Sequence, residues 1–401
     1  MKRLTLNKID FFVFIAVLAV CLSGNFSPFK FLSINAVQLF IICYLTLNLK
    51  SVYYAKVPAW ALIFVLYAVS LLFVSYLNFL YFSVEEIQYF SGSVNPLLYF
   101  ILSFGRVFIL VIILYLTSAK TDLSTEFKFL KKFTKSLFYF LSVSVFLQAT
   151  AFYFFQVTFG FKFFYGDSVR FGSFIGEPQT LQSWISSAFV CYICLISQNN
   201  LKDTLFSRKL ILLQVTHVIT LFLCSSTVWI VAVFAFYIFS LYRLRLISNI
   251  LLVAACFSIA QVIMPKISVD ILSISERSIT ILAGAEIFTK NLSNIFVGYG
   301  LGMSPYLIIS SSWFENFPVF LMSEFGRQTV MNSFFGLLFE VGILLTLPIV
   351  VLTFKFLYFG RVFVATFMTG LMGSMSTGNA FWAPSFALIL ATVLVSYRVK
   401  R

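Results

Sequence analysis

The chain has little charge for its length. Charged residues make up 10% of its 401 residues, against about 25% in an average soluble domain. Apolar residues make up 61%, against roughly 45–50%. A globule of this size has no interior large enough to hide so much apolar surface, so we expect lipid to form part of its surroundings. This excludes a soluble enzyme, a secreted disulfide scaffold, a disordered tail and a coiled coil.

The chain is also poor in groups that build polar active sites. Its one histidine, His217, lies within an apolar run, which excludes a Ser-His-Asp triad and a histidine-rich metal site. A helix–helix hydrogen bond and a catalytic role both stay open for it. Cys191 and Cys194 form a CxxC with no second pair nearby, so we predict no metal site and no cofactor. A GxxxxGK[ST] phosphate loop is missing as well, which argues against ATP-driven transport by this chain.

The net charge of +14 is consistent with a membrane protein. In a soluble protein such a charge would suggest nucleic acid. In membrane proteins, however, lysine and arginine mark the cytoplasmic loops. We therefore predict no nucleic-acid partner.

Long apolar runs predict about twelve transmembrane helices, each near the 20 residues that cross the hydrocarbon. The fold class is thus an all-α polytopic membrane protein with a single membrane domain over residues 1–401. The predicted spans lie near residues 9–24, 31–49, 58–80, 94–119, 137–160, 179–197, 209–225, 227–242, 246–264, 329–353, 362–377 and 381–397.

The positions of the basic residues give the orientation. With twelve spans and both termini in the cytoplasm, most of the 28 lysines and arginines fall in inner loops. Fusing the runs near 209–242 or 362–397 into single helices would spoil this asymmetry. The topology leaves two sizeable periplasmic loops, 161–178 and 265–328, which we interpret as functional. In the second, Ile281–Phe296 is predicted to form an amphipathic helix.

Polar chemistry concentrates in these outer loops. Arginines at 170, 277 and 327 suit a diphosphate, because guanidinium groups bind phosphate oxygens in a two-pronged manner. Ordinary pairing with the outer acids is the other interpretation. Arg106 lies within a predicted span and should face a cavity or a partner, and a structural pair with Glu340 is one possibility. Three glutamines of spans five and six line a cavity or bond neighbouring helices: Gln148, Gln156 and Gln182.

Three outer segments together resemble a known family. Arg170-Phe-Gly-Ser-Phe-Ile-Gly-Glu177-Pro178 resembles the Arg-x-x-Gly-x-x-x-(Glu/His)-Pro segment of the O-antigen polymerase and ligase superfamily. Arg277, followed by Gly298-Tyr-Gly-Leu-Gly302, resembles its second loop signature. Asn332-Ser-Phe-Phe-Gly-Leu-Leu-Phe-Glu340-Val-Gly342 resembles its third. Order, spacing and predicted membrane side all agree. The family's loop histidine is replaced by Met331, which argues against ligase activity and leaves the general base unassigned.

The resemblance implies a glycosyltransferase of the bacterial inner membrane, with its active site facing the periplasm. It would polymerise oligosaccharide repeat units carried on undecaprenyl diphosphate into O-antigen or a related surface polysaccharide. The implied partners are these lipid-linked glycans, the bilayer and a separate chain-length regulator. Two alternatives stay open: a ligase that transfers the glycan to lipid A–core, and a lipid-linked oligosaccharide flippase.

Residue roles follow from the resemblance. Arg170 and Arg277 would bind the diphosphate, with Arg327 as a third candidate. Glu177 would activate the acceptor hydroxyl, although a neighbouring arginine weakens a carboxylate base, and Glu324 is the alternative. The other predicted substrate-binding residues include three glycines that allow close backbone approach: Gly298, Gly300 and Gly302. Asn332 would orient the acceptor or cap the next helix, and Arg106 is the arginine within a span.

Overall fold

The structure is a computed structural model, and it describes the helical and hairpin segments of the chain. These comprise residues 8–22, 122–157, 159–165, 168–175, 178–197, 207–224, 271–300, 311–315, 333–357 and 384–400, with short pieces at 37, 39–41, 43–44, 58–59, 61–63, 65–71, 73–74, 77, 115–116, 229, 232–233, 236–237, 365–366 and 369–370.

This described part is 89% helical, which is compatible with the predicted all-α class. Several helices coincide with predicted spans. They are α1 (Lys8–Leu22), α7 (Pro178–Ile196), α9 (Arg208–Cys224), α17 (Ser333–Leu357) and α19 (Pro384–Lys400). The spans predicted at 94–119 and 246–264 lie almost wholly outside the described residues. The number of spans and their orientation therefore stay predictions.

Helix α6 (Leu123–Phe155) is the longest described element and extends well before its predicted span. Asp122 caps it by accepting hydrogen bonds from the backbone N–H groups of Ser124 and Thr125, at 3.1 and 3.3 Å. The Thr125 hydroxyl donates to the same carboxyl, and these bonds lower the pKa of Asp122. At the other end Gln156 adopts a left-handed conformation with φ 57°, which is a common way to end a helix.

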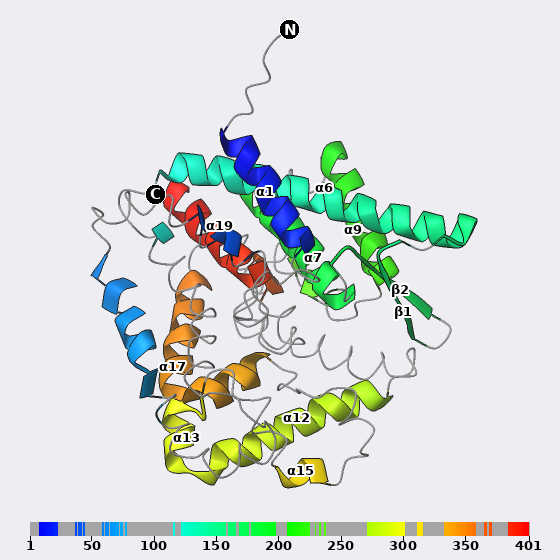
Figure 1. The fold of residues 1–401 in the computed structure, drawn as a ribbon. Coiled ribbons are helices and arrows are strands. Elements are labelled where there is room, and N and C mark those ends of the chain that lie inside the picture. The colour runs from blue at the N-terminus through cyan, green and yellow to red at the C-terminus, as the bar shows by residue number, and fades with distance from the viewer. Residues whose placement is uncertain are drawn as a thin grey trace.

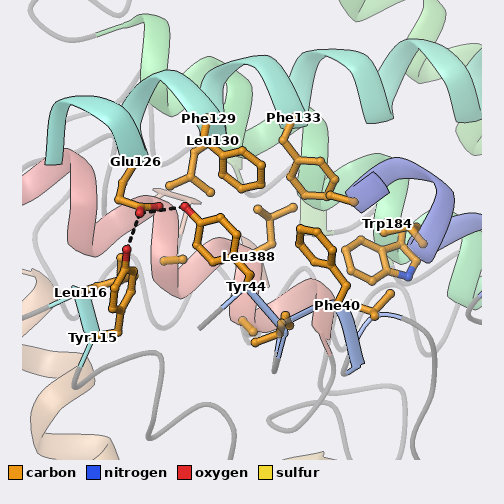
Figure 2. Close-up of a pocket in the computed structure, with 16 residues that line it drawn as sticks. Phe40, Tyr44, Tyr115, Leu116, Glu126, Phe129, Leu130, Phe133, Trp184 and Leu388 are labelled. Carbon is orange, nitrogen blue, oxygen red and sulfur yellow. Dashed lines mark hydrogen bonds between the residues drawn. The ribbon is translucent and has the colours of Figure 1, made fainter. Parts of the chain in front are cut away.

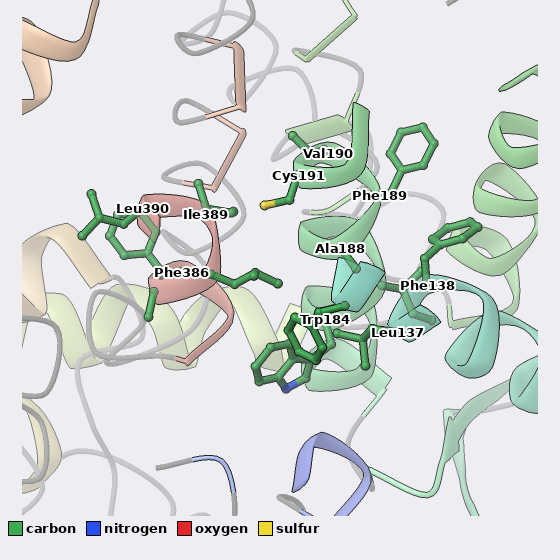
Figure 3. Packing of buried hydrophobic residues seen from close by; sticks show 14 of the residues in the cluster. Leu137, Phe138, Trp184, Ala188, Phe189, Val190, Cys191, Phe386, Ile389 and Leu390 are labelled. Atoms are coloured by element: carbon green, nitrogen blue, oxygen red, sulfur yellow. The ribbon is translucent and has the colours of Figure 1, made fainter. Parts of the chain in front are cut away.

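The core forms where α6, α7 and α19 pack together. From α6, Leu137, Phe138 and Leu141 are fully buried, and their spacing places them on one helical face. Figure 3 shows side chains from the three helices in this cluster, including Phe189 of α7 and Ile389 of α19. Helix α1 packs on α6, and α9 packs on α6 and α7.

A second group of helices occupies the lower side of the view in Figure 1, and Leu337, Val341 and Leu345 of α17 connect it to the core. It consists of α12 (Ile271–Lys290), α13 (Leu292–Val297), α15 (Ser312–Glu315) and α17. Helix α12 contacts the other three, and α13 packs against α17. The predicted amphipathic segment 281–296 is therefore helical, but it is divided at Asn291 into two helices. Whether it lies on a membrane face stays a prediction.

The first predicted loop contains a β-hairpin that the sequence did not suggest. Strands β1 (Phe161–Tyr165) and β2 (Ser168–Ser173) pair antiparallel, with Arg170 opposite Phe163. The hairpin lies beside the C-terminal part of α6 (Figure 1). Strand β2 contacts α6, α7 and α9, so this loop is held against the helical core.

Among the described helices, one has the length and composition to cross a bilayer, namely Leu123–Phe155. The other apolar helices there are shorter, with apolar parts at Ala61–Leu71, Thr180–Ile196, Leu210–Cys224, Phe335–Pro348 and Ser385–Val399. Placement of the chain in a membrane therefore stays a prediction from composition.

Candidate functional site

Arg170 lies on a hairpin that one glutamine fastens to α6. The Gln148 side-chain amide donates to the Phe159 carbonyl at 2.7 Å and accepts from the Ser173 backbone N–H at 2.9 Å. The Ser173 hydroxyl also donates to the Ser144 hydroxyl at 2.6 Å. Gln148 is 2% exposed, so both of its bonds are shielded from water. One side chain thus joins the chain before β1 to the end of β2.

Backbone geometry brings these strand ends together. Gly160 has φ +69°, and a Cβ atom there would lie 2.5 Å from the Ser173 carbonyl oxygen. This close approach therefore requires glycine. Phe171 is buried against Phe152 and Tyr153 of α6. Successive strand residues point to opposite faces, so Arg170 lies on the other face of β2, where its Nε atom is also buried.

We expect Gln148→Met to loosen the hairpin, because it removes both the donor and the acceptor. The loss should be about 2 kcal/mol of stability, since each buried hydrogen bond contributes about 1 kcal/mol. Limited proteolysis within residues 161–173 would measure the effect. Phe154→Leu, at an exposed position of the same helix, is the control, and equal cleavage of Gln148→Met and wild type would contradict the clamp.

The second and third sequence segments meet in a backbone junction. The Tyr299 N–H donates to the Phe339 carbonyl at 3.1 Å, and the Gly300 N–H donates to the Glu340 carbonyl at 3.0 Å. These contacts join the end of α13 to the middle of α17. Segments some 40 residues apart in sequence, each noticed separately, therefore form one structural unit.

Two glycines make this junction possible. Gly298 and Gly342 have φ of 75° and 73° with ψ of 173° and 177°, a region essentially restricted to glycine. A Cβ on Gly298 would lie 2.3 Å from the Glu340 carbonyl oxygen, and one on Gly342 would lie 2.3 Å from that of Phe296. Gly342 also interrupts the helical geometry of α17.

This geometry gives the glycines a contact that the sequence interpretation did not include. Gly298 and Gly300 were predicted to approach a sugar or phosphate, and in the structure their backbone approaches α17. The substrate contact stays a prediction for both. Gly302 lies outside the described residues.

The other predicted site residues are described in part or not at all. Arg277 lies on α12, but its side chain is outside the described part. In Figure 1 the first residues of α12 form the end away from α13. Glu340 is 1% exposed, and the partner proposed for it from the sequence, Arg106, is not described. The remaining predicted residues that lie outside the described part are Glu177, Glu324, Arg327, Met331 and Asn332.

No protein-family model, curated protein or solved structure shows significant similarity to the chain.

His217 belongs to a buried polar row between α7 and α9. Its Nε2 lies 3.0 Å from the Ser186 hydroxyl, which also accepts from the Gln182 amide at 2.8 Å. The Phe189 ring stacks on the imidazole with centroids 4.0 Å apart. His217 is fully buried, so the structure favours the helix–helix role over the catalytic one. Gln182 likewise bonds within its own helix and lies in this row.

Glu126 is a buried acid to which the sequence interpretation gave no role. It lies in the first turn of α6 and is 6% exposed. The Tyr44 and Tyr115 hydroxyls donate to its Oε1 at 2.8 and 2.6 Å. Figure 2 shows the three side chains meeting at one end of an apolar pocket. The pocket has a volume of about 120 Å³ and also contains Trp184 and Leu388. Tyrosines within apolar runs, which need buried acceptors, were the only sequence signal.

We expect Glu126→Leu to destabilise the protein by about 2 kcal/mol or more, because it removes the acceptor that both tyrosines use. Glu126→Gln is the matched control, since its carbonyl oxygen can accept the same two bonds. Thermal unfolding of the purified protein would measure the difference. If both variants had the melting temperature of the wild type, the Glu126 hydrogen bonds would not contribute to stability.

Proposed function

We propose that the protein polymerises lipid-linked oligosaccharide repeat units at the periplasmic face of the bacterial inner membrane. The observation that carries the proposal is the junction of Gly298–Gly300 with Phe339 and Glu340. Two segments that resemble signatures of the O-antigen polymerase and ligase superfamily lie in direct contact, as parts of one site would.

The position of Arg170 is the second support. Its hairpin is fastened to α6 through Gln148, so its backbone is held before any substrate arrives. Fixed positive groups stabilise a charge that develops in a transition state without a reorganisation cost. Arg277 would bind the same diphosphate from α12, a helix that contacts both α13 and α17.

In the proposed reaction a sugar hydroxyl of the acceptor repeat unit attacks the anomeric carbon of the donor glycan. The new glycosidic bond forms as the bond to the diphosphate oxygen breaks, and undecaprenyl diphosphate leaves with the bonding electrons. A carboxylate, Glu177 or Glu324, takes the hydroxyl proton. Arg170, Arg277 and Arg327 hold the leaving diphosphate. Asn332 orients the acceptor, and Gly302 allows close approach of the backbone. The reaction needs no cofactor.

Deletion of the gene tests this function. Gel analysis of surface polysaccharide from the deletion strain should show lipid A–core bearing one repeat unit and no ladder, and the wild-type gene should restore the ladder. Core with no repeat unit would indicate a ligase or a flippase instead. An unchanged ladder would exclude all three functions in that strain.

A further inference from the structure

A long groove runs along α6 on the side of α1 and ends at Phe159 and Phe174, on either side of the hairpin that carries Arg170. Its volume is about 880 Å³. Helix α1 contributes Asp10 and Val13, and the chain around the hairpin contributes Phe159 and Phe174. From Lys132 to Leu147 the wall follows α6 for about 22 Å, at 1.5 Å per residue.

The groove is charged at one end only. Lys132 and Lys135 lie there with Ser136. Lys132 forms an ion pair with Asp10 at 2.6 Å. The structure gives Lys135 no such pair within the described residues, and its side chain is exposed. Lys128 lies seven residues before Lys135 and therefore on the same helical face. Three lysines against the single Asp10 carboxylate leave this end of the groove positive.

The rest of the groove is apolar and aromatic. Beyond Ser136, the α6 wall presents Tyr139, Phe140, Val143 and Leu147, and only Ser144 among them is a small polar residue. Each of these four large apolar side chains is more than 40% exposed. These exposed apolar side chains line a hollow beside α6, which suits an extended acyl chain.

We propose that this groove binds one anionic phospholipid of the inner leaflet. The phosphate group lies at Lys135 and Lys132, near the Ser136 hydroxyl, and one acyl chain follows the apolar wall toward Phe159 and Phe174. Basic residues beside an apolar surface are the general pattern for anionic lipids. The length also fits, because half of a bilayer core is about 15 Å thick and the groove accommodates a chain together with its head group.

The combination of a basic end and an apolar wall distinguishes a phospholipid from other possible occupants. A peptide helix leaves unpaired backbone groups at both of its ends, and the end of the groove at Leu147, Phe159 and Phe174 offers them no polar side chain. A free phosphate ion would leave the apolar length empty. The inference requires the chain to lie in a bilayer, as its composition predicts, and does not rest on the proposed polymerase activity.

Native mass spectrometry of the purified full-length protein tests the site. The protein is incubated with equal amounts of phosphatidylglycerol and phosphatidylcholine, and the retained lipid is counted. Wild type should retain one phosphatidylglycerol in preference to phosphatidylcholine. Lys135→Gln should reduce this retention about fivefold. Val143→Trp, which fills the apolar part and keeps both lysines, should also reduce it.

The control is Lys290→Gln, which makes the same charge change on α12, outside the groove, and should retain lipid as wild type does. Equal retention of the two lipids by wild type would overturn the proposal, even if the variants failed to fold. Displacement of the retained lipid by inorganic phosphate alone would also overturn it. In a second incubation with undecaprenyl phosphate and phosphatidylglycerol, Lys135-dependent retention of undecaprenyl phosphate alone would overturn it as well. None of these results would bear on the polysaccharide ladder of the deletion strain.

Discussion

Replacing Arg170 with lysine is expected to abolish most polymerisation, with a loss of about 100-fold. Lysine keeps the positive charge but cannot bind two phosphate oxygens in the planar, two-pronged manner of a guanidinium. Removal of one preorganised donor to a developing charge costs about 10²–10³ in rate. Complementation of the deletion strain with the variant, followed by gel analysis of the polysaccharide ladder, measures the effect.

Two further variants sharpen the Arg170 experiment. Arg277→Lys should have the same phenotype if both arginines hold one diphosphate. Arg398→Lys is the matched control. Arg398 lies near the C-terminus and donates to the Leu116 carbonyl, a bond that lysine can also make, so its ladder should be normal. Membrane levels of all three proteins must be equal, and a full ladder from Arg170→Lys would remove the diphosphate assignment.

Alanine at Gly298 or Gly342 is expected to disrupt the junction of α13 with α17. Either Cβ atom would lie 2.3 Å from a carbonyl oxygen of the facing segment, and either residue would have to keep a conformation reserved for glycine. The conformational term alone costs about 1–3 kcal/mol, and the steric overlap adds to it. We expect a strongly lowered melting temperature and loss of the polysaccharide ladder.

The two glycine variants together give a sharper measurement than either alone. Because both break the same junction, the double variant should cost clearly less than the sum of the single variants. Leu292→Ala is the control, since Leu292 lies on α13 and is 71% exposed. Simple additivity of the two costs would show that the glycines do not share one contact.

Local hydrophobicity predicted the helices well where a run had clear ends. Helices α7 and α9 begin and end within one residue of the predicted spans 179–197 and 209–225. The start of α6 was not predicted, because its first turns carry lysines, which the hydrophobicity pattern assigns to a loop. The Asp122 cap, visible only with its bonds to Ser124 and Thr125, explains why the helix begins there.

The hairpin was missed because its residues continue an apolar, aromatic run. Phe161–Tyr165 was predicted as the start of a loop, since its aromatic residues show no strand alternation. The change to a strand follows two residues with positive φ, Gln156 and Gly160. The clamp by Gln148 and the burial of Glu126 are contacts between distant segments. Residue spacing along one chain carries no information about which distant segments meet, so neither contact could be predicted.

The interlocked glycines have a consequence for the evolution of this chain. Each one faces backbone atoms of the opposite segment at a distance that leaves no room for a Cβ atom, so a change at either position separates the segments and removes the constraint on the other. Descendant sequences should therefore carry glycine at both positions or at neither, and such paired inheritance would trace this junction through relatives too divergent to align by eye.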